Sequence, residues 1–175
     1  AGYLTVPDAA DFDFSGGVWS IDLWHYRTSI VDGQVIFYQQ TDANNYIKIS
    51  LISSGTSASV KLSIYSTSSE VVTLTSSISV LRNTWSHISI VENGDNYYIF
   101  INGELSGYAS DTSRAANFTG TVYIGAFSTP ANYLAGYVDE FRVSNSARWT
   151  AAFAPPSAAY GPTYDSTTYI GSIMP

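Results

Sequence analysis

The chain has 175 residues, enough for one domain with a substantial core, and 45% of them are hydrophobic whereas only 12% are charged. The net charge of -7 and the seven scattered Lys and Arg residues argue against a protein that binds nucleic acid through its phosphates. Without cysteine, a signal segment or an apolar run of roughly 18 residues, the sequence favours a protein with no membrane insertion that folds in a reducing cytoplasm. If the protein acts outside the cell, we expect it to be exported as part of a larger assembly or released by cell lysis.

Hydrophobic and polar residues alternate along most of the chain, which is the two-residue period of half-buried β-strands. Ile47, Ile49 and Leu51 show the pattern clearly, because each lies next to a polar or amphipathic residue. The alternation predicts strands, in chain order, over residues 47–51, 60–64, 71–74, 78–81, 85–92, 97–101, 105–108, 121–124 and 137–143.

Turn residues separate these predicted strands. A cluster of Ser, Gly and Thr at 53–57 favours a hairpin, and Asn93-Gly94 and Asn102-Gly103 favour two more, because Asn and Gly tolerate positive φ. The 3.6-residue period of a helix is absent, and only a single helical turn near residues 146–150 is predicted. Short strands with turns about every 8–12 residues predict an all-β fold, a two-sheet antiparallel jelly-roll sandwich.

Several segments, in chain order, resemble the laminin G-like family of concanavalin A-like lectin domains, in its phage-associated branch. They are YLTVPDAADFDF (3–14), WSIDLW (19–24), WSHISIV (85–91), IFING (99–103), YIGA (123–126), GYVDEFRV (136–143) and ARWTAAFAPP (147–156). The resemblance implies a jelly roll over residues 1–156. It also implies a module that binds carbohydrate or protein, of a kind frequent in phage tail, fibre and capsid-associated proteins.

Residues 157–175 form a C-terminal arm rich in Tyr, Pro, Gly and small residues, which cannot build a core of its own. Relatives usually begin with strands before the YLTVPD segment, whereas this chain starts at that segment. A sandwich without those strands leaves backbone unpaired at a sheet edge. We therefore expect residues 167–174 to pair there, within the subunit or in a neighbour. Exchange predicts a homo-oligomer, with a trimer favoured and contacts from Tyr164, Tyr169, Ile170 and Ile173.

The residues that catalysis would need are not grouped in the sequence. Hydrolytic relatives of this fold carry an E-x-D-x-E pattern on one strand, and none of the four glutamates at 70, 92, 104 and 140 lies in such a pattern. Asp139 and Glu140 are adjacent, so we expect them on opposite faces of their strand. His25 and His87 lie on different predicted strands without a cysteine or serine nucleophile. The sequence therefore predicts a non-enzyme in which His87 is a core histidine and His25 carries no functional signal.

Asp139 is a weak candidate for a metal ligand. Alternation places it on the same side of its strand as Tyr137, Phe141 and Val143, which we expect to be the core side. A buried carboxylate there accepts hydrogen bonds, pairs with a base or binds a metal. The laminin G-like resemblance implies Ca²⁺ as the metal, but the sequence does not assemble the several oxygen ligands that Ca²⁺ takes. We predict no metal site and no cofactor.

Sugar binding needs aromatic faces next to short polar side chains in rim loops. Three predicted loops offer this combination, at residues 42–46, 93–97 and 128–133. The best candidates are Asn132 and Tyr133, followed by Asn44, Asn45 and Tyr46; ordinary turn chemistry with a surface tyrosine is the alternative. We expect the remaining large rings to be structural, with Trp19, Trp24 and Trp85 in the core and Trp149 packed on the sandwich.

These observations predict a non-enzymatic structural protein of a phage virion, either a capsid decoration (cement) protein or a tail-associated protein. It would lie on the virion surface, extracellular after release, in contact with other virion proteins and with glycans of the host cell. The alternative is a carbohydrate-recognition module of a tail fibre or a bacterial adhesin. A glycan-cleaving enzyme is a more distant third hypothesis.

Overall fold

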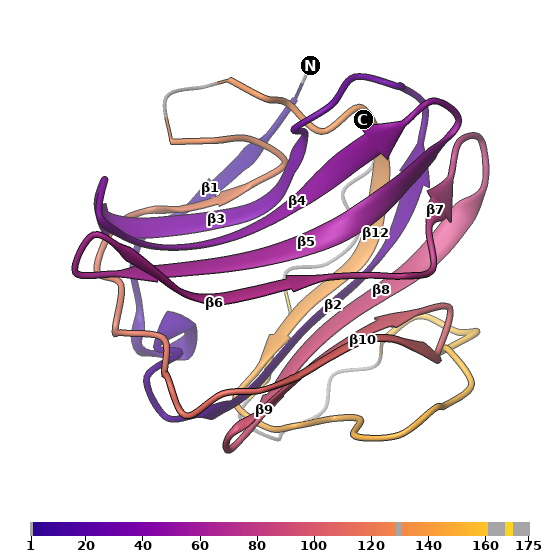
Figure 1. The fold of residues 1–175 in the computed structure, drawn as a ribbon. Coiled ribbons are helices and arrows are strands. Elements are labelled where there is room, and N and C mark those ends of the chain that lie inside the picture. The colour runs from indigo at the N-terminus through magenta and orange to yellow at the C-terminus, as the bar shows by residue number, and fades with distance from the viewer. Residues whose placement is uncertain (1, 129–130, 161–166, 170–175) are drawn as a thin grey trace.

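The computed structural model describes residues 2–128, 131–160 and 167–169, which form two antiparallel sheets packed face to face (Figure 1). The first sheet has the order β1-β11-β3-β4-β5-β6, with β7 paired to β5. Its strands are β1 (Leu4–Val6), β11 (Val122–Ile124), β3 (Val35–Asp42), β4 (Asn45–Ser54), β5 (Ser57–Ser66), β6 (Ser69–Thr75) and β7 (Val80–Leu81).

The second sheet has the order β10-β9-β8-β2-β12-β13. Its strands are β10 (Glu104–Ser110), β9 (Asn96–Ile101), β8 (Trp85–Asn93), β2 (Val18–Arg27), β12 (Gly136–Ser144) and β13 (Thr167–Tyr169). The predicted all-β, two-sheet antiparallel sandwich is therefore confirmed.

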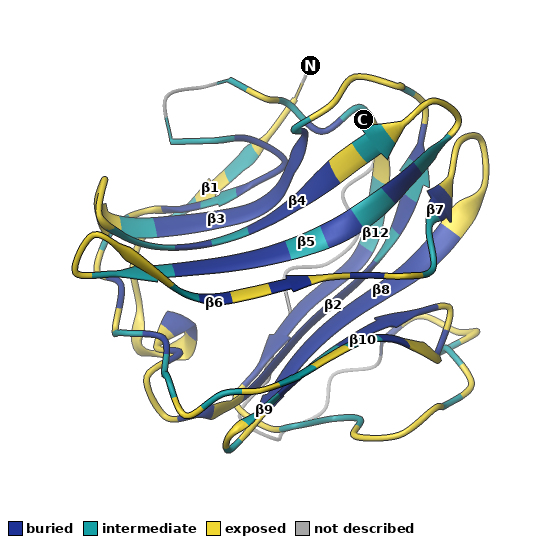
Figure 2. Cartoon of the chain, viewed as in Figure 1, coloured by how far each residue is buried: buried dark blue, intermediate teal, exposed yellow. Residues whose placement is uncertain are grey.

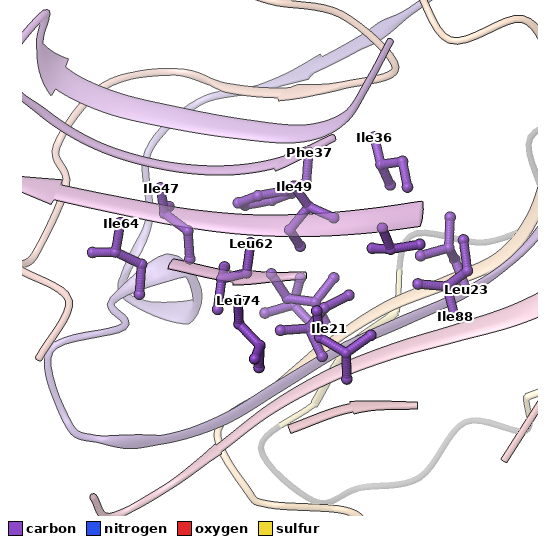
Figure 3. Close-up of a cluster of buried hydrophobic side chains, with 14 of the residues drawn as sticks. Ile21, Leu23, Ile36, Phe37, Ile47, Ile49, Leu62, Ile64, Leu74 and Ile88 are labelled. Carbon is purple, nitrogen blue, oxygen red and sulfur yellow. The ribbon is translucent and has the colours of Figure 1, made fainter. Parts of the chain in front are cut away.

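The hydrophobic core lies between the two sheets and consists of the alternate side chains of each strand. Ile47 and Ile49 of β4 point toward Ile21 and Leu23 of β2, and all four are 0% exposed (Figure 3). Figure 2 shows the same division along the strands, where buried residues dominate the middle of each sheet and exposed residues lie in turns and at edges. Burial of apolar surface on this scale is the main stabilising contribution to such a sandwich.

Some elements differ from those that the sequence predicts. Strands β1 and β3 carry no simple alternation, because β1 is only three residues long and β3 contains register shifts at both of its ends. The single helical turn expected near residues 146–150 does not form; a 3-10 turn, η1 (Ala10–Phe12), occurs instead and buries Phe12. In the part of the chain that the structure describes, no helix is long and apolar enough to cross a membrane.

A C-terminal segment covers part of the outer face of the second sheet. We call residues 145–160 the C-terminal cover; they carry Trp149, Phe153 and Tyr160 onto that face, where Phe153 lies 5.4 Å from Phe100. Beyond the cover, β13 pairs with β12 through Arg142↔Tyr169, so part of the arm adds a strand to the second sheet within the same chain. Tyr164, Ile170 and Ile173 lie outside the described residues.

His25 faces the interior near one end of the sandwich and gives the fold a pH dependence. Burial, and next the positive charge of Arg27, lowers the pKa of His25 from 6.5 to about 4. The unfolded chain therefore takes up a proton as pH falls below about 6.5, whereas the folded chain does so only near pH 4. The free energy of unfolding should drop by about 2–3 kcal/mol between pH 7 and pH 4.5 through this residue alone.

Urea denaturation of the wild type and of His25→Leu at both pH values measures this contribution. We expect the stability difference between the two proteins to shift by that amount in favour of the variant at low pH. Parallel pH profiles for the two proteins would contradict the prediction.

Candidate functional site

Aromatic side chains line up across the outer face of the first sheet, which the C-terminal cover does not reach. The rings form two groups, within each of which contacting centroids are 4.3–6.4 Å apart, including 4.7 Å between the stacked rings of Tyr46 and Tyr65, and the pairing of Tyr123 with Tyr38 sets the groups on adjacent strands. We call this row the aromatic band; its members are Tyr3, Tyr133, Tyr123, Phe127, Tyr38, Tyr46 and Tyr65. It crosses strands β1, β11, β3, β4 and β5, and at about 4.8 Å per strand it is about 20 Å long.

Strand alternation and register place these rings together. Val122 and Ile124 of β11 point into the core, so Tyr123 between them points outward. Tyr123 lies opposite Tyr38, and Tyr46 lies opposite Tyr65. Two pairs in the band are therefore cross-strand neighbours, and aromatic pairs of this kind stabilise a sheet.

The exposed parts of the band form two groups. Tyr38 is only 1% exposed, because Phe127 packs on its ring at a centroid distance of 4.3 Å. On one side of this pair lie Tyr46 and Tyr65, which are half-buried. Tyr3 lies on the other side with Tyr123 and Tyr133, and it is 41% exposed. A ligand on this face would contact aromatic rings on both sides of the Tyr38–Phe127 pair.

Two lysines and one carboxylate accompany the group around Tyr46. The Nζ atom of Lys48 lies 5.8 Å from the centroid of the Tyr46 ring, in a cation–π arrangement. Lys61 Nζ lies 3.3 Å from Glu70 Oε1. Burial, followed by the charge of Lys61, lowers the pKa of Lys48, and Glu70 opposes the shift.

The phenols of Tyr38 and Tyr46 remain neutral at physiological pH and therefore can both donate and accept hydrogen bonds. Burial raises the pKa of Tyr38 to about 12. Burial, with the neighbouring Tyr65 as the next cause, raises the pKa of Tyr46 to about 12. The hydroxyl of Tyr38 already donates to Gln40 Oε1. The band thus combines apolar ring faces with polar edges, as a sugar-binding surface requires.

The structure brings both predicted loop candidates to this face, one near each end of the band. Tyr133 joins the group around Tyr3, and Tyr46 lies in the other group. The asparagines serve mainly as structural links: Asn132 Nδ2 donates to Gly33 O (3.0 Å), and Asn45 Nδ2 donates to the carboxylate of Asp42 (2.9 Å).

Asn44 lies exposed at the tip of the β3–β4 hairpin, where its backbone oxygen accepts a hydrogen bond from Ser68 N. Sequence reasoning missed Tyr38, Tyr65, Tyr123 and Lys48 as members of a surface, because their proximity depends on the pairing of distant strands.

Beneath the C-terminal cover lies a buried polar cluster centred on Asp22, which is 0% exposed. Arg142 donates to both carboxylate oxygens of Asp22, from Nε at 3.0 Å and from Nη2 at 2.8 Å. The Tyr160 hydroxyl donates to Asp22 Oδ2 at 2.6 Å, and Tyr160 OH also lies 3.1 Å from His87 Nε2. The burial and the adjacent Asp22 charge raise the pKa of Tyr160. This cluster has no exposed face, so it attaches the cover to the sheet.

Two predictions about neighbouring rings need correction. Trp85 was expected in the core, but it lies on the outer face of the second sheet, is 42% exposed and contacts Tyr26 edge-on. Trp24 is half-buried on the same face. His87 shares this face with Trp85 and is buried only because Trp149 and Phe153 lie over it. Trp19 is buried in the core, 2% exposed.

Asp139 does not point into the core as alternation predicts. A β-bulge between Asp139 and Arg142, with Glu140 at φ 52°, places Asp139 opposite Trp24 on the outer side of the sheet. Asp139 Oδ1 accepts a hydrogen bond from Glu140 N, and Glu140 is itself turned toward the cover, accepting from Tyr160 N at 2.6 Å. The expectation that Asp139 and Glu140 lie on opposite faces is therefore wrong, because the bulge inserts an extra residue and interrupts the alternation of side chains along β12.

Asp139 belongs to no cluster of metal-ligating side chains in the part of the chain that the structure describes. Among residues 2–128, 131–160 and 167–169, no group of three or more His, Cys, Asp or Glu side chains gathers where it could hold a metal ion. The glutamates likewise lie on separate strands: Glu70 pairs with Lys61, and Glu92 is buried against Trp19 and Arg114.

Residues 1–152 match the laminin G family model described as the concanavalin A-like lectin/glucanases superfamily. No curated protein sequence matches the chain at a significant level. Solved structures with a similar fold include domain 4 of the extracellular arabinanase AbnA of Geobacillus stearothermophilus in complex with arabinotriose. Its TM-score is 0.62 and its identity 18%, over 82% of this chain and 66% of that chain.

A putative carbohydrate-binding protein from Bacteroides ovatus has a TM-score of 0.70 and 16% identity over 97% of this chain and 48% of that chain. Tailspike protein 2 of the Escherichia coli O157:H7 bacteriophage CAB120 has a TM-score of 0.59 and 12% identity over 83% of this chain and 21% of that chain. The chain thus spans less than two thirds of each of these proteins. On the family match, which covers most of its length, the chain belongs to the concanavalin A-like lectin/glucanases superfamily.

Proposed function

We propose that the chain is a non-enzymatic glycan-binding domain and that the aromatic band is its binding surface. The observation that carries the proposal is the pair of stacked, half-buried rings of Tyr46 and Tyr65 beside Tyr38, on the outer face of the first sheet. Sugar rings present apolar C–H faces that pack on aromatic rings, and their hydroxyls need polar partners at the ring edges. A surface about 20 Å long suits an oligosaccharide better than a single sugar.

The fold likeness supports this proposal, because one similar structure was solved with arabinotriose and another is described as a putative carbohydrate-binding protein. The proposed domain needs no metal, since its surface consists of rings and hydroxyls. Removal of divalent cations by a chelator should therefore leave the affinity unchanged.

The test is a glycan array followed by affinity measurements on Tyr46→Ala. The variant should bind the best glycan about tenfold or more weakly, because comparable stacking of one ring contributes roughly 1–3 kcal/mol. Tyr108→Ala is the matched control: Tyr108 is 53% exposed but lies on β10 in the other sheet. A protein that binds no glycan, or a Tyr46→Ala variant that binds like the wild type with an unchanged fold, would refute the function.

We further propose that this domain belongs to a phage virion, as a capsid decoration or tail-associated protein that meets host glycans outside the cell. The resemblance of the sequence segments to the phage-associated branch of the family and the fold likeness to a phage tailspike protein support this setting. The alternative is a recognition module of a tail fibre or bacterial adhesin. Light scattering after size-exclusion chromatography separates the two, because the virion proposal expects a homo-oligomer, with a trimer favoured, and the alternative expects a monomer with clear glycan binding.

A further inference from the structure

Both lysines of the chain lie on the outer face of the first sheet. The sequence contains only Lys48 and Lys61, in a chain of 175 residues with a net charge of -7. Lys48 is on β4 opposite Ser63, and Lys61 is on β5 opposite Ser50, so the two are diagonal neighbours across adjacent strands. An acidic protein thus concentrates its ammonium groups beside the aromatic band.

The two lysines differ in their ion pairing. Glu70 pairs with Lys61 at 3.3 Å, and the carboxylate of Asp42 accepts hydrogen bonds from Asn44 N and Asn45 Nδ2. Lys48 has no carboxylate within ion-pair distance among the described residues, although it is half-buried. Lys61 therefore has an ion-pair partner and Lys48 does not, since Glu70 pairs with Lys61 and the carboxylate of Asp42 is held by the amides of its own turn.

A half-buried ammonium group without a counter-ion is costly, and an anion placed beside it recovers part of the lost solvation. The lowered pKa of Lys48, caused first by burial and then by Lys61, is consistent with this missing counter-ion. The Tyr46 ring below Lys48 stabilises the cation but does not neutralise it. The position next to Lys48 and above Tyr46 and Tyr65 is thus suited to a ring that carries an oxyanion.

We propose that the glycan bound by the aromatic band is acidic, with the carboxylate or sulfate of one sugar held by Lys48 while that sugar's ring packs against Tyr46 and Tyr65. This inference rests on the proposed glycan-binding function and specifies the ligand class of the same surface. An ammonium–oxyanion contact at a partly dehydrated site is a strong hydrogen bond, so Lys48 would determine the preference for acidic over neutral glycans.

The experiment uses an array of matched pairs, in which each neutral oligosaccharide is present with its sialylated, uronic acid-containing and sulfated counterparts. The wild type should bind acidic members at least tenfold more tightly than their neutral partners, and added salt should reduce the difference. Comparison of the carboxylated and sulfated arms identifies the anion. Lys48→Met, which keeps the apolar stem, should bring the acidic and neutral affinities to within about threefold, whereas Lys48→Arg should preserve the preference.

Lys61→Met is the matched control, because Lys61 is already paired with Glu70 and its loss should change the preference much less. Neutral glycans that bind as tightly as acidic ones, and depend on Tyr46 but not on Lys48, would overturn this inference and leave the proposed function intact. An acidic preference that survives Lys48→Met would overturn it as well. The absence of any bound glycan would refute both proposals.

Discussion

Replacement of Asp22 by alanine is expected to lower the free energy of unfolding by about 3–5 kcal/mol, because it leaves the buried guanidinium of Arg142 without its counter-ion. The wild-type carboxylate accepts two hydrogen bonds from Arg142 and one from Tyr160. Arg142 is only 8% exposed and its Cζ lies 3.8 Å from the centroid of the Tyr160 ring, so water cannot readily replace the lost partner. Urea denaturation measures the loss.

Asp95→Ala provides the matched control for this measurement. Asp95 also pairs with an arginine, Arg114, but its side chain is 53% exposed, so removal of that pair should cost no more than about 1 kcal/mol. The double variant Asp22→Leu/Arg142→Met should regain part of the stability, because no buried charge is then left alone. If Asp22→Ala costs as little as Asp95→Ala, the cluster does not attach the C-terminal cover as we infer.

The sequence predicted the strands because alternation is a local property, but the aromatic band depends on non-local pairing. Tyr38 and Tyr123 are far apart in the sequence and become neighbours only when β11 pairs with β3. Tyr46 was recognised as a candidate because an asparagine precedes it in a predicted loop, whereas Tyr65 lies within a strand and gave no such signal. Nothing in the sequence distinguished Lys48 from other surface residues, because its proximity to Lys61 follows from the register between β4 and β5.

Two local departures from regular structure explain the errors about individual residues. The bulge in β12 shifts the alternation, so that Asp139 lies on the outer side although Phe141 and Val143 point into the core. Trp85 and His87 have the same orientation on β8, yet only His87 lies under the C-terminal cover. Neither a bulge nor the path of a covering segment produces a two-residue hydrophobic period. The alternation of the sequence therefore could not predict either feature.

The two Asn-Gly turns predicted from the sequence look equivalent, but the structure predicts very different effects for the same substitution in each. Gly94 and Gly103 both have positive φ, 64° and 79°, so alanine at either position costs about 1–2 kcal/mol of backbone strain. A Cβ on Gly94 would meet no atom within 4 Å, whereas a Cβ on Gly103 would lie 1.9 Å from Phe153 O.

Gly103→Ala should therefore be the more destabilising variant, because the C-terminal cover must move away from the β9–β10 turn. Phe153 N donates to Gly103 O at 3.0 Å, and the Phe153 ring stacks on Trp149 at 4.0 Å, so a shift of this backbone disturbs the rings over His87. We expect a total loss of about 3–4 kcal/mol on urea denaturation, from strain plus overpacking, with a change in tryptophan fluorescence. Gly94→Ala should lose only the strain and keep the wild-type spectrum. Equal losses of stability for the two variants would mean that the C-terminal cover can move away from Gly103 without a loss of free energy. Its attachment would then have to depend on the Asp22 cluster alone.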